Sequence, residues 1–236
     1  MNLTGKTAVI TGATGALGSV LVKHFLGLGA TVGAPYTSEK SRNVLTNIST
    51  SGKQLLTARA DLTSETETYQ FVEKVIVTFG RIDILINAAG GYAGGKLLEE
   101  SSVSEFEDLY KMNFMTALLM CRAALPLMRK QASGRIVNIA AMPAMSPKSR
   151  MGPYAVSKRA VITLTETLAE EVKGTGVTVN AVAPSIILTE ANRLSMPDAD
   201  FSKWVTPLEI AQLITYLSSE EARAVNGNVI KIYGGA

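Results

Sequence analysis

Residues 7–18 read TAVITGATGALG, a short apolar run followed by glycines at 12, 15 and 18. The apolar run predicts a strand over Thr7–Thr11, and the residues after the glycines have the pattern of a helix. Such glycines permit a tight turn, a close approach of the backbone to a pyrophosphate and close helix packing, while the helix start offers N–H groups to an anion. The stretch therefore predicts a nucleotide-binding strand–turn–helix unit, with a plain strand-to-helix turn as the alternative.

The alternation of β-rich runs and helical patterns continues along the chain. The further strands that we expect are 30–34, 54–60, 82–87, 135–140, 178–183 and 229–233, and the helices are 16–28, 39–50, 65–79, 104–130, 154–173 and 207–217. Nearly continuous apolar strands such as Ile82–Ile86 are typical of a parallel sheet covered by helices on both faces. The pattern predicts an α/β fold of the Rossmann type, with a doubly wound seven-stranded parallel sheet.

No repeat, low-complexity tract or linker divides the chain, so we expect residues 1–236 to form a single domain. The segment Ser185–Val205 is long and irregular. Long irregular segments in compact domains are commonly functional, and residues 185–209 are therefore interpreted as a substrate flap.

Composition excludes several classes of function. The 23 basic and 20 acidic residues are spread without a block of like charge, so neither a nucleic-acid nor a membrane partner is expected, and the partner is a small molecule. The single cysteine, Cys121, excludes an internal disulfide and a cysteine-rich metal site, and no metal is expected. No signal-peptide pattern and no apolar run of about 18 residues occurs, which predicts a cytoplasmic protein.

Residues that could bind a ligand or transfer a proton follow the glycine motif along the chain. They are Asp61, the run from Asn87 to Gly90, Asn113, Tyr154 and Lys158. Tyr154 and Lys158 are four residues apart and share one helical face, where a lysine can lower a phenol pKa and hold the tyrosine as a proton donor.

This ordered set resembles the short-chain dehydrogenase/reductase family, from Lys6 to about Gly235. The matching motifs are TGxxxGxG, an Asp near the adenine, NAAG, the mid-helix Asn, YxxxK, and Asn180-x-x-x-Pro184 with Thr189. The resemblance implies Tyr154 as the acid, Lys158 on the nicotinamide ribose and Asn113 holding a water in a proton relay. It also implies a homodimer or homotetramer.

The resemblance further implies which residues contact the cofactor. Asp61 and Leu62 lie at the adenine, Asn87 steadies the central strands, and Ile187 and Thr189 contact the carboxamide end. The full cofactor set is Gly12, Thr14, Gly15, Ala16, Leu17, Gly18, Tyr36, Thr37, Ser38, Asp61, Leu62, Asn87, Ala88, Gly90, Lys158, Pro184, Ile187 and Thr189.

The residues after the second strand indicate which cofactor is bound. An acidic residue there would select NAD by bonding the ribose 2′-hydroxyl, whereas neutral or basic residues accommodate the 2′-phosphate of NADP. Tyr36 stands at the discriminating position, and Thr37, Ser38, Lys40 and Arg42 can meet a phosphate. NADP(H) is favoured over NAD(H), although the glycine loop lacks the basic residue common in NADP-preferring relatives.

Ala141 departs from the family pattern. It lies thirteen residues before Tyr154, where relatives carry a serine that donates a hydrogen bond to the substrate oxygen. By analogy with the loss of an oxyanion donor, its absence costs about 3 kcal/mol for an ordinary ketone. An activated acceptor needs less polarisation and is less affected.

One branch of the family, the quinonoid dihydropteridine reductases, also lacks this serine. The glycine-rich loop Gly90–Gly95 and the flap segment Asn192–Glu209 are similar to that branch, whereas the non-acidic Tyr36 is not, since that branch prefers NADH. Trp204 in the flap is predicted either to stack on a flat substrate or to clamp the flap onto the core.

Three functions follow from these features. The first is an NAD(P)H-dependent oxidoreductase that reduces an activated carbonyl or quinonoid acceptor, such as a quinonoid dihydropterin, with Ala141, Tyr154 and Trp204 at the substrate. The second is a 3-oxoacyl or ketone reductase of the broad family type. The third is a cofactor-binding protein with little turnover, which the retention of Asn113, Tyr154 and Lys158 disfavours.

Overall fold

Parallel strands form one sheet in a computed structural model that describes residues 1–48 and 54–235. The strands are β1 (Thr7–Ile10), β2 (Thr31–Tyr36), β3 (Leu55–Arg59), β4 (Ile84–Asn87), β5 (Gly134–Ile139), β6 (Val177–Pro184) and β7 (Val229–Ile232). Within the described residues the order across the seven-stranded sheet is β3-β2-β1-β4-β5-β6-β7, and each neighbouring pair is parallel. The predicted doubly wound seven-stranded parallel sheet is confirmed.

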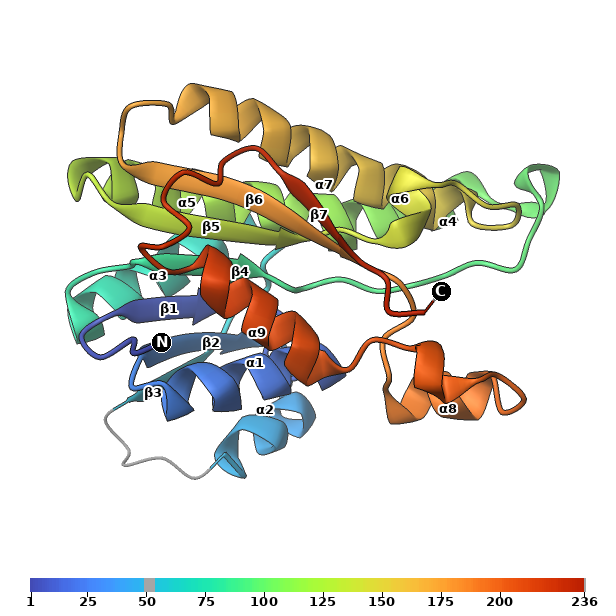
Figure 1. Ribbon diagram of the computed structural model, residues 1–236, viewed down its shortest axis with the longest axis horizontal. Coiled ribbons are helices and arrows are strands. Elements are labelled where there is room, and N and C mark those ends of the chain that lie inside the picture. The colour runs from blue at the N-terminus through green and yellow to red at the C-terminus, as the bar shows by residue number, and fades with distance from the viewer. Residues whose placement is uncertain (49–53, 236) are drawn as a thin grey trace.

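Helices cover both faces of this sheet (Figure 1). The longer ones are α1 (Ala16–Gly27), α2 (Glu39–Thr46), α3 (Glu65–Phe79), α4 (Val103–Tyr110), α5 (Thr116–Lys130), α7 (Gly152–Glu171) and α9 (Pro207–Leu217). One core cluster joins α1, α2 and α9 to the sheet, and a second joins α3, α5 and α7 to its other face. The sheet is therefore buried between two helical layers, which explains its continuously apolar strands.

The carboxyl ends of β1 and β4 meet at the point where the strand order reverses. A Cβ atom on Gly12, just after β1, would lie 2.5 Å from the carbonyl oxygen of Ala88, just after β4. Gly12 also has φ +62°, a left-handed conformation that favours glycine. The fold thus places the glycine motif and the Asn87–Gly90 run at the switch point where doubly wound sheets bind ligands.

Strand β2 extends beyond the predicted end at Ala34 and includes Pro35. Thr31 N donates to Lys6 O, so the odd-numbered amides of β2 face β1, but the β1 pairing ends at Gly33. Because Pro35 lies beyond that pairing, its missing N–H removes no ladder hydrogen bond.

The predicted helix 104–130 is not continuous. It is divided into α4, a π-helical turn (Lys111–Met115) and α5. Isolated π turns often mark functional positions, and this one contains Asn113. The wider turn was not predictable from periodicity, because helical residues occur on both sides of it.

The segment 185–205 is less irregular than predicted. It contains α8 (Glu190–Ser195) and a 3₁₀ turn (Phe201–Lys203), each begun by a side-chain cap from Thr189 and Asp200. Another short helix, α6 (Met142–Met145), was not predicted because four residues carry too little periodicity.

The predicted helix 39–50 ends at Thr46, and its residues 49–50 lie outside the described part of the chain. None of the helices among the described residues is long and apolar enough to cross a membrane.

Candidate active site

The glycine loop between β1 and α1 is shaped to approach another backbone closely. A Cβ atom on Gly18 would lie 2.0 Å from the carbonyl oxygen of Gly12, so only glycine fits there. No side chain caps α1 among the described residues, and Gly15 and Ala16 at its start are exposed. Thr14 and Leu17 are half-buried beside them. The first-turn N–H groups can therefore bind a phosphate, as the sequence predicts for this loop.

Basic side chains surround the end of β2. Arg59 Nε donates to Thr37 O at 3.4 Å, and the Arg42 guanidinium lies 6.0 Å from the centre of the Tyr36 ring. Glu39 forms an ion pair with Arg42 at 3.2 Å, but both side chains are exposed, and such surface pairs are weak. Ser38 caps α2 by accepting a hydrogen bond from Ser41 N at 3.2 Å. This corner combines positive charge with hydroxyl groups, which suits a phosphate better than a ribose hydroxyl alone.

Asp61 and Leu62 follow β3 at the same edge. Asp61 Oδ1 accepts hydrogen bonds from Thr63 N at 2.9 Å and Thr63 Oγ1 at 2.7 Å. These bonds hold the pKa of the Asp61 carboxyl below its usual range. Asp61 is exposed and Leu62 is buried, so the turn presents the Asp61 carboxylate to solvent at this end of the sheet.

Asn87 belongs to a buried polar chain that joins β4, β5 and α7. Its Nδ2 donates to Asn138 Oδ1 at 2.8 Å, and Asn138 Nδ2 donates to Thr165 Oγ1 at 2.9 Å. Since the Asn87 side chain belongs to this series of hydrogen bonds, it links the central strands β4 and β5. Of the residues that follow it at the carboxyl end of β4, Ala88 is half-buried and Gly90 is exposed.

The Asn113 amide is committed to two neighbouring elements. Its Oδ1 accepts from Gly91 N at 2.8 Å, and its Nδ2 donates to Gly91 O at 3.1 Å and to Ser157 Oγ at 2.9 Å. Both amide hydrogens are therefore used, so the side chain fixes the loop after β4. A relay water would therefore bind to the second lone pair of Asn113 Oδ1 or to the Asn113 backbone in the π turn.

Tyr154 is half-buried near the start of α7, where its ring meets Tyr92. The ring centres are 5.1 Å apart and nearly perpendicular. Burial, and secondarily Tyr92, raise the pKa of Tyr154 to about 12. The expected lowering of this pKa by Lys158 is thus not found, because burial disfavours the phenolate. At neutral pH Tyr154 is a protonated phenol and can donate a proton.

Lys158 is 5% exposed and donates from Nζ to Ile139 O at 2.8 Å. Burial lowers the pKa of Lys158 to about 8. A Cβ atom on Gly90 would lie 3.2 Å from Lys158 Nζ and 2.4 Å from Asn113 Oδ1. Gly90, Asn113 and Lys158 therefore meet, although they come from three separate elements.

Ala141 lies at the end of β5 and is only 4% exposed. Its backbone is extended, and its carbonyl accepts from Ala144 N at 3.0 Å at the start of α6. Ser146 and Ser149, the nearest hydroxyls along the chain, are exposed on the following loop. Position 141 itself therefore offers no side-chain hydrogen-bond donor.

The two ends of the flap are tied to each other. Ile187 forms a parallel bridge with Val205, and Asn192 Nδ2 donates to Ile187 O at 2.8 Å. Pro184 ends β6, and Thr189 caps α8. Trp204 is only 7% exposed and packs on Phe201, with ring centres 4.8 Å apart. This burial supports the clamping alternative for Trp204 over stacking on a substrate.

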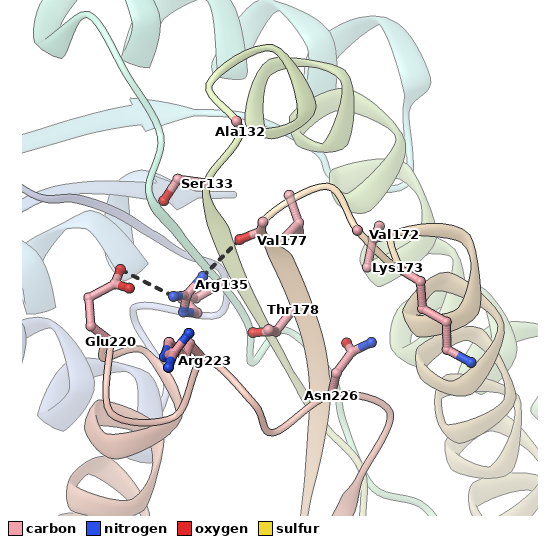
Figure 2. A pocket seen from close by; sticks show the side chains of 12 residues that line it. Ala132, Ser133, Arg135, Val172, Lys173, Val177, Thr178, Glu220, Arg223 and Asn226 are labelled. Atoms are coloured by element: carbon pink, nitrogen blue, oxygen red, sulfur yellow. Dashed lines mark hydrogen bonds and ion pairs between the residues drawn. The ribbon is translucent and has the colours of Figure 1, made fainter.

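A hollow of about 410 Å³ lies at the amino ends of the strands, where β5 and β6 begin (Figure 2). Arg135 in its wall donates to Ser219 O at 3.2 Å, to Gly176 O at 3.1 Å and to Glu220 at 3.1 Å. These bonds join β5 to the turn before β6 and to the turn after α9. Because ligands of doubly wound sheets bind at the carboxyl ends of the strands, we interpret this hollow as structural.

Comparisons with known proteins agree with this geometry. The family model described as short chain dehydrogenase matches residues 6–200. The chain belongs to the short-chain dehydrogenase family and is an oxidoreductase of that family.

Individual relatives span the whole chain. The 3-oxoacyl-[acyl-carrier-protein] reductase FabG of Thermotoga maritima is 32% identical, with 100% of this chain and 99% of the relative covered. The solved structure of levodione reductase is 27% identical with a TM-score of 0.90, covering 99% and 98% of the two chains. The structure titled ElxO with NADP bound is 28% identical with a TM-score of 0.91, and 98% of each chain is covered.

Four residues near the site were not predicted as site residues. They are Arg59, Tyr92, Arg150 and Ser157. Tyr92 had a detectable signal, as an aromatic residue within a glycine-rich loop after a strand. The other three act through contacts with residues far away in the sequence, and no local pattern indicates these.

Proposed function

We propose that this chain is an NADPH-dependent reductase of an activated carbonyl or quinonoid acceptor. The observation that carries the proposal is that the half-buried phenol Tyr154 is retained while position 141 is a buried alanine. The site retains an acid but lacks the second hydrogen-bond donor on which a plain ketone depends.

The chain's own residues bind the cofactor and deliver a proton. Gly12–Gly18 receives the pyrophosphate, and Lys158 with Gly90 receives the nicotinamide ribose. When bound, the nicotinamide supplies hydride to the acceptor carbon. Tyr154 donates the proton that the acceptor oxygen or nitrogen gains, and the buried Asn113 and Ser157 amide–hydroxyl pair keeps the surrounding loop fixed.

Arg42 and Arg59 support NADPH as the natural cofactor, because their positive charges can bind a 2′-phosphate. The NADP named with the ElxO structure agrees with this choice. We expect NADPH to bind at least about tenfold more tightly than NADH, as measured by fluorescence titration.

Arg42 and Arg59 form a basic corner at the end of β2, and their replacement tests this cofactor preference. Arg42→Ala and Arg59→Ala should weaken NADPH and leave NADH almost unchanged. Arg122→Ala, at an exposed position of α5 beside Glu65, is the control. A tenfold preference of the wild type for NADH would overturn the assignment.

The experiment that tests the substrate class restores the missing hydroxyl. Ala141→Ser should raise kcat/KM for a plain ketone by about a hundredfold, and change turnover of an activated diketone or quinone much less, because only the plain ketone needs the extra donor. Ala144→Ser, an equally buried position on α6, controls for the burial of a hydroxyl. If neither ketone turnover nor substrate preference changes, Ala141 does not determine the substrate class.

A second candidate function is the reduction of 3-oxoacyl thioesters, which the FabG relative supports by its name. The two functions differ in the wild-type enzyme. Faster NADPH oxidation with an acetoacetyl thioester than with quinones, diketones or a quinonoid dihydropterin would favour the second candidate.

We extend the proposal to a homodimer or homotetramer in the cytoplasm. Tyr110, Met112 and Val156 are exposed apolar side chains near the packed α4 and α7 helices, and a subunit contact would cover them.

A further inference from the structure

The loop 90–95 after β4 is fixed at both of its ends. At its start, the Asn113 amide makes two hydrogen bonds to the Gly91 backbone, at 2.8 and 3.1 Å. At its end, Gly95 N donates to Arg150 O at 2.8 Å, and Arg150 Nη1 donates to Gly95 O at 3.0 Å. Two reciprocal pairs of hydrogen bonds therefore hold a loop that is otherwise exposed.

Arg150 contributes to this arrangement in a strained backbone conformation. Its φ is +66°, in the left-handed region that costs a non-glycine residue about 1 kcal/mol or more. Such a conformation persists only where its surroundings determine it, and here the contacts with Gly95 do so. Arg150 thus acts as a positioning residue for the loop.

One glycine of this loop, Gly94, makes room for the Tyr92 side chain, and another, Gly91, makes room for Met112. A Cβ atom on Gly94 would lie 2.6 Å from the Tyr92 hydroxyl, and one on Gly91 would lie 2.6 Å from Met112 Sδ. The Tyr92 ring stands nearly perpendicular to the Tyr154 ring, with centres 5.1 Å apart, yet Tyr92 remains 62% exposed. An aromatic surface is thus held beside the proton donor and is open to solvent.

We propose that Tyr92 is a specificity-determining residue that orients flat, conjugated acceptors beside Tyr154, an inference that rests on the proposed function. Position 141 provides no second donor beside Tyr154 to orient the acceptor oxygen, so a further contact is needed to fix the plane of the acceptor. A ring fixed next to the acid supplies one by stacking on a planar acceptor. Aromatic pairs contribute about 0.5–1.5 kcal/mol beyond the area they bury, which corresponds to an effect of up to about tenfold.

The test compares Tyr92→Leu with Tyr92→Phe on a planar and an acyclic acceptor. With 9,10-phenanthrenequinone, Tyr92→Leu should lower kcat/KM by about tenfold, and Tyr92→Phe should retain it because the ring is kept. With 2,3-hexanedione, both variants should match the wild type. An equal loss on both acceptors, or no loss on either, would overturn the role in selection.

A binding measurement decides the role of Tyr92 without turnover. In the complex with NADP⁺ no reductant is present, so phenanthrenequinone binding can be titrated calorimetrically in the wild type, Tyr92→Leu, Tyr92→Phe and the control Tyr69→Leu, an exposed tyrosine of α3. We expect about tenfold weaker binding in Tyr92→Leu alone. Equal binding by all four proteins, or no saturable binding by the wild type, would overturn the proposal.

The two measurements also separate this inference from the proposed function. If the wild type binds the quinone through Tyr92 but reduces no carbonyl or quinone, the proposed function fails and the binding role of Tyr92 stands. If reduction proceeds and Tyr92→Leu behaves like the wild type in both assays, the inference about Tyr92 fails and the reductase remains.

Discussion

Replacement of Tyr154 by phenylalanine is expected to lower kcat by about a thousandfold with an activated diketone as acceptor. The substitution removes the hydroxyl and keeps the ring that packs against Tyr92 at 5.1 Å. The loss therefore reports on the hydroxyl and not on the packing of the ring. Steady-state NADPH oxidation measures this effect directly.

Cofactor binding provides the control for this variant. The glycine loop and the basic corner do not contact the Tyr154 hydroxyl, so the affinity for NADPH should change by less than about twofold. Tyr110→Phe, which removes a hydroxyl from α4 on the same side of the sheet, should be as active as the wild type. Unchanged turnover in Tyr154→Phe would exclude the role of this tyrosine as the acid.

The fold could be predicted from the sequence because each strand has its own local pattern. The apolar runs at Ile82–Ile86 and Thr7–Thr11 indicated buried parallel strands, and the glycine motif showed where the first strand ends. The prediction failed where the cause was not local. Strand β2 passes through Pro35 because the pairing with β1 ends two residues earlier, and only the sheet register reveals this.

The sequence predicts which residues form the site, which stays a prediction, but it does not predict their contacts. Tyr154 and Lys158 were predicted to interact through their spacing, yet Lys158 Nζ bonds Ile139 O and burial raises the pKa of Tyr154. Spacing on a helix determines which face a side chain occupies, whereas the electrostatics depend on the strand ends packed against that face. The contribution of Arg150 was likewise hidden, since its partner Gly95 lies 55 residues away.

The burial of the Lys158 ammonium group lowers the free energy of unfolding. An ordinary lysine has a pKa of 10.5, and burial lowers that of Lys158 to about 8. Between these values the unfolded chain binds a proton that the folded chain has lost, so stability rises with pH across this window. Below pH 8 the folded chain has to carry a buried ammonium group, and the full penalty is present.

Lys158→Met is therefore expected to lose turnover and also to lose this pH dependence. Between pH 7 and pH 10 the unfolding free energy of the wild type should rise by about 2 kcal/mol relative to that of the variant. Urea unfolding at the two pH values measures the difference, and Lys74→Met, an exposed position on α3, is the matched control. If the unfolding free energies of the wild type and Lys158→Met change equally with pH, burial does not destabilise the Lys158 ammonium. Placing this cation beside the cofactor ribose would then carry no cost in stability.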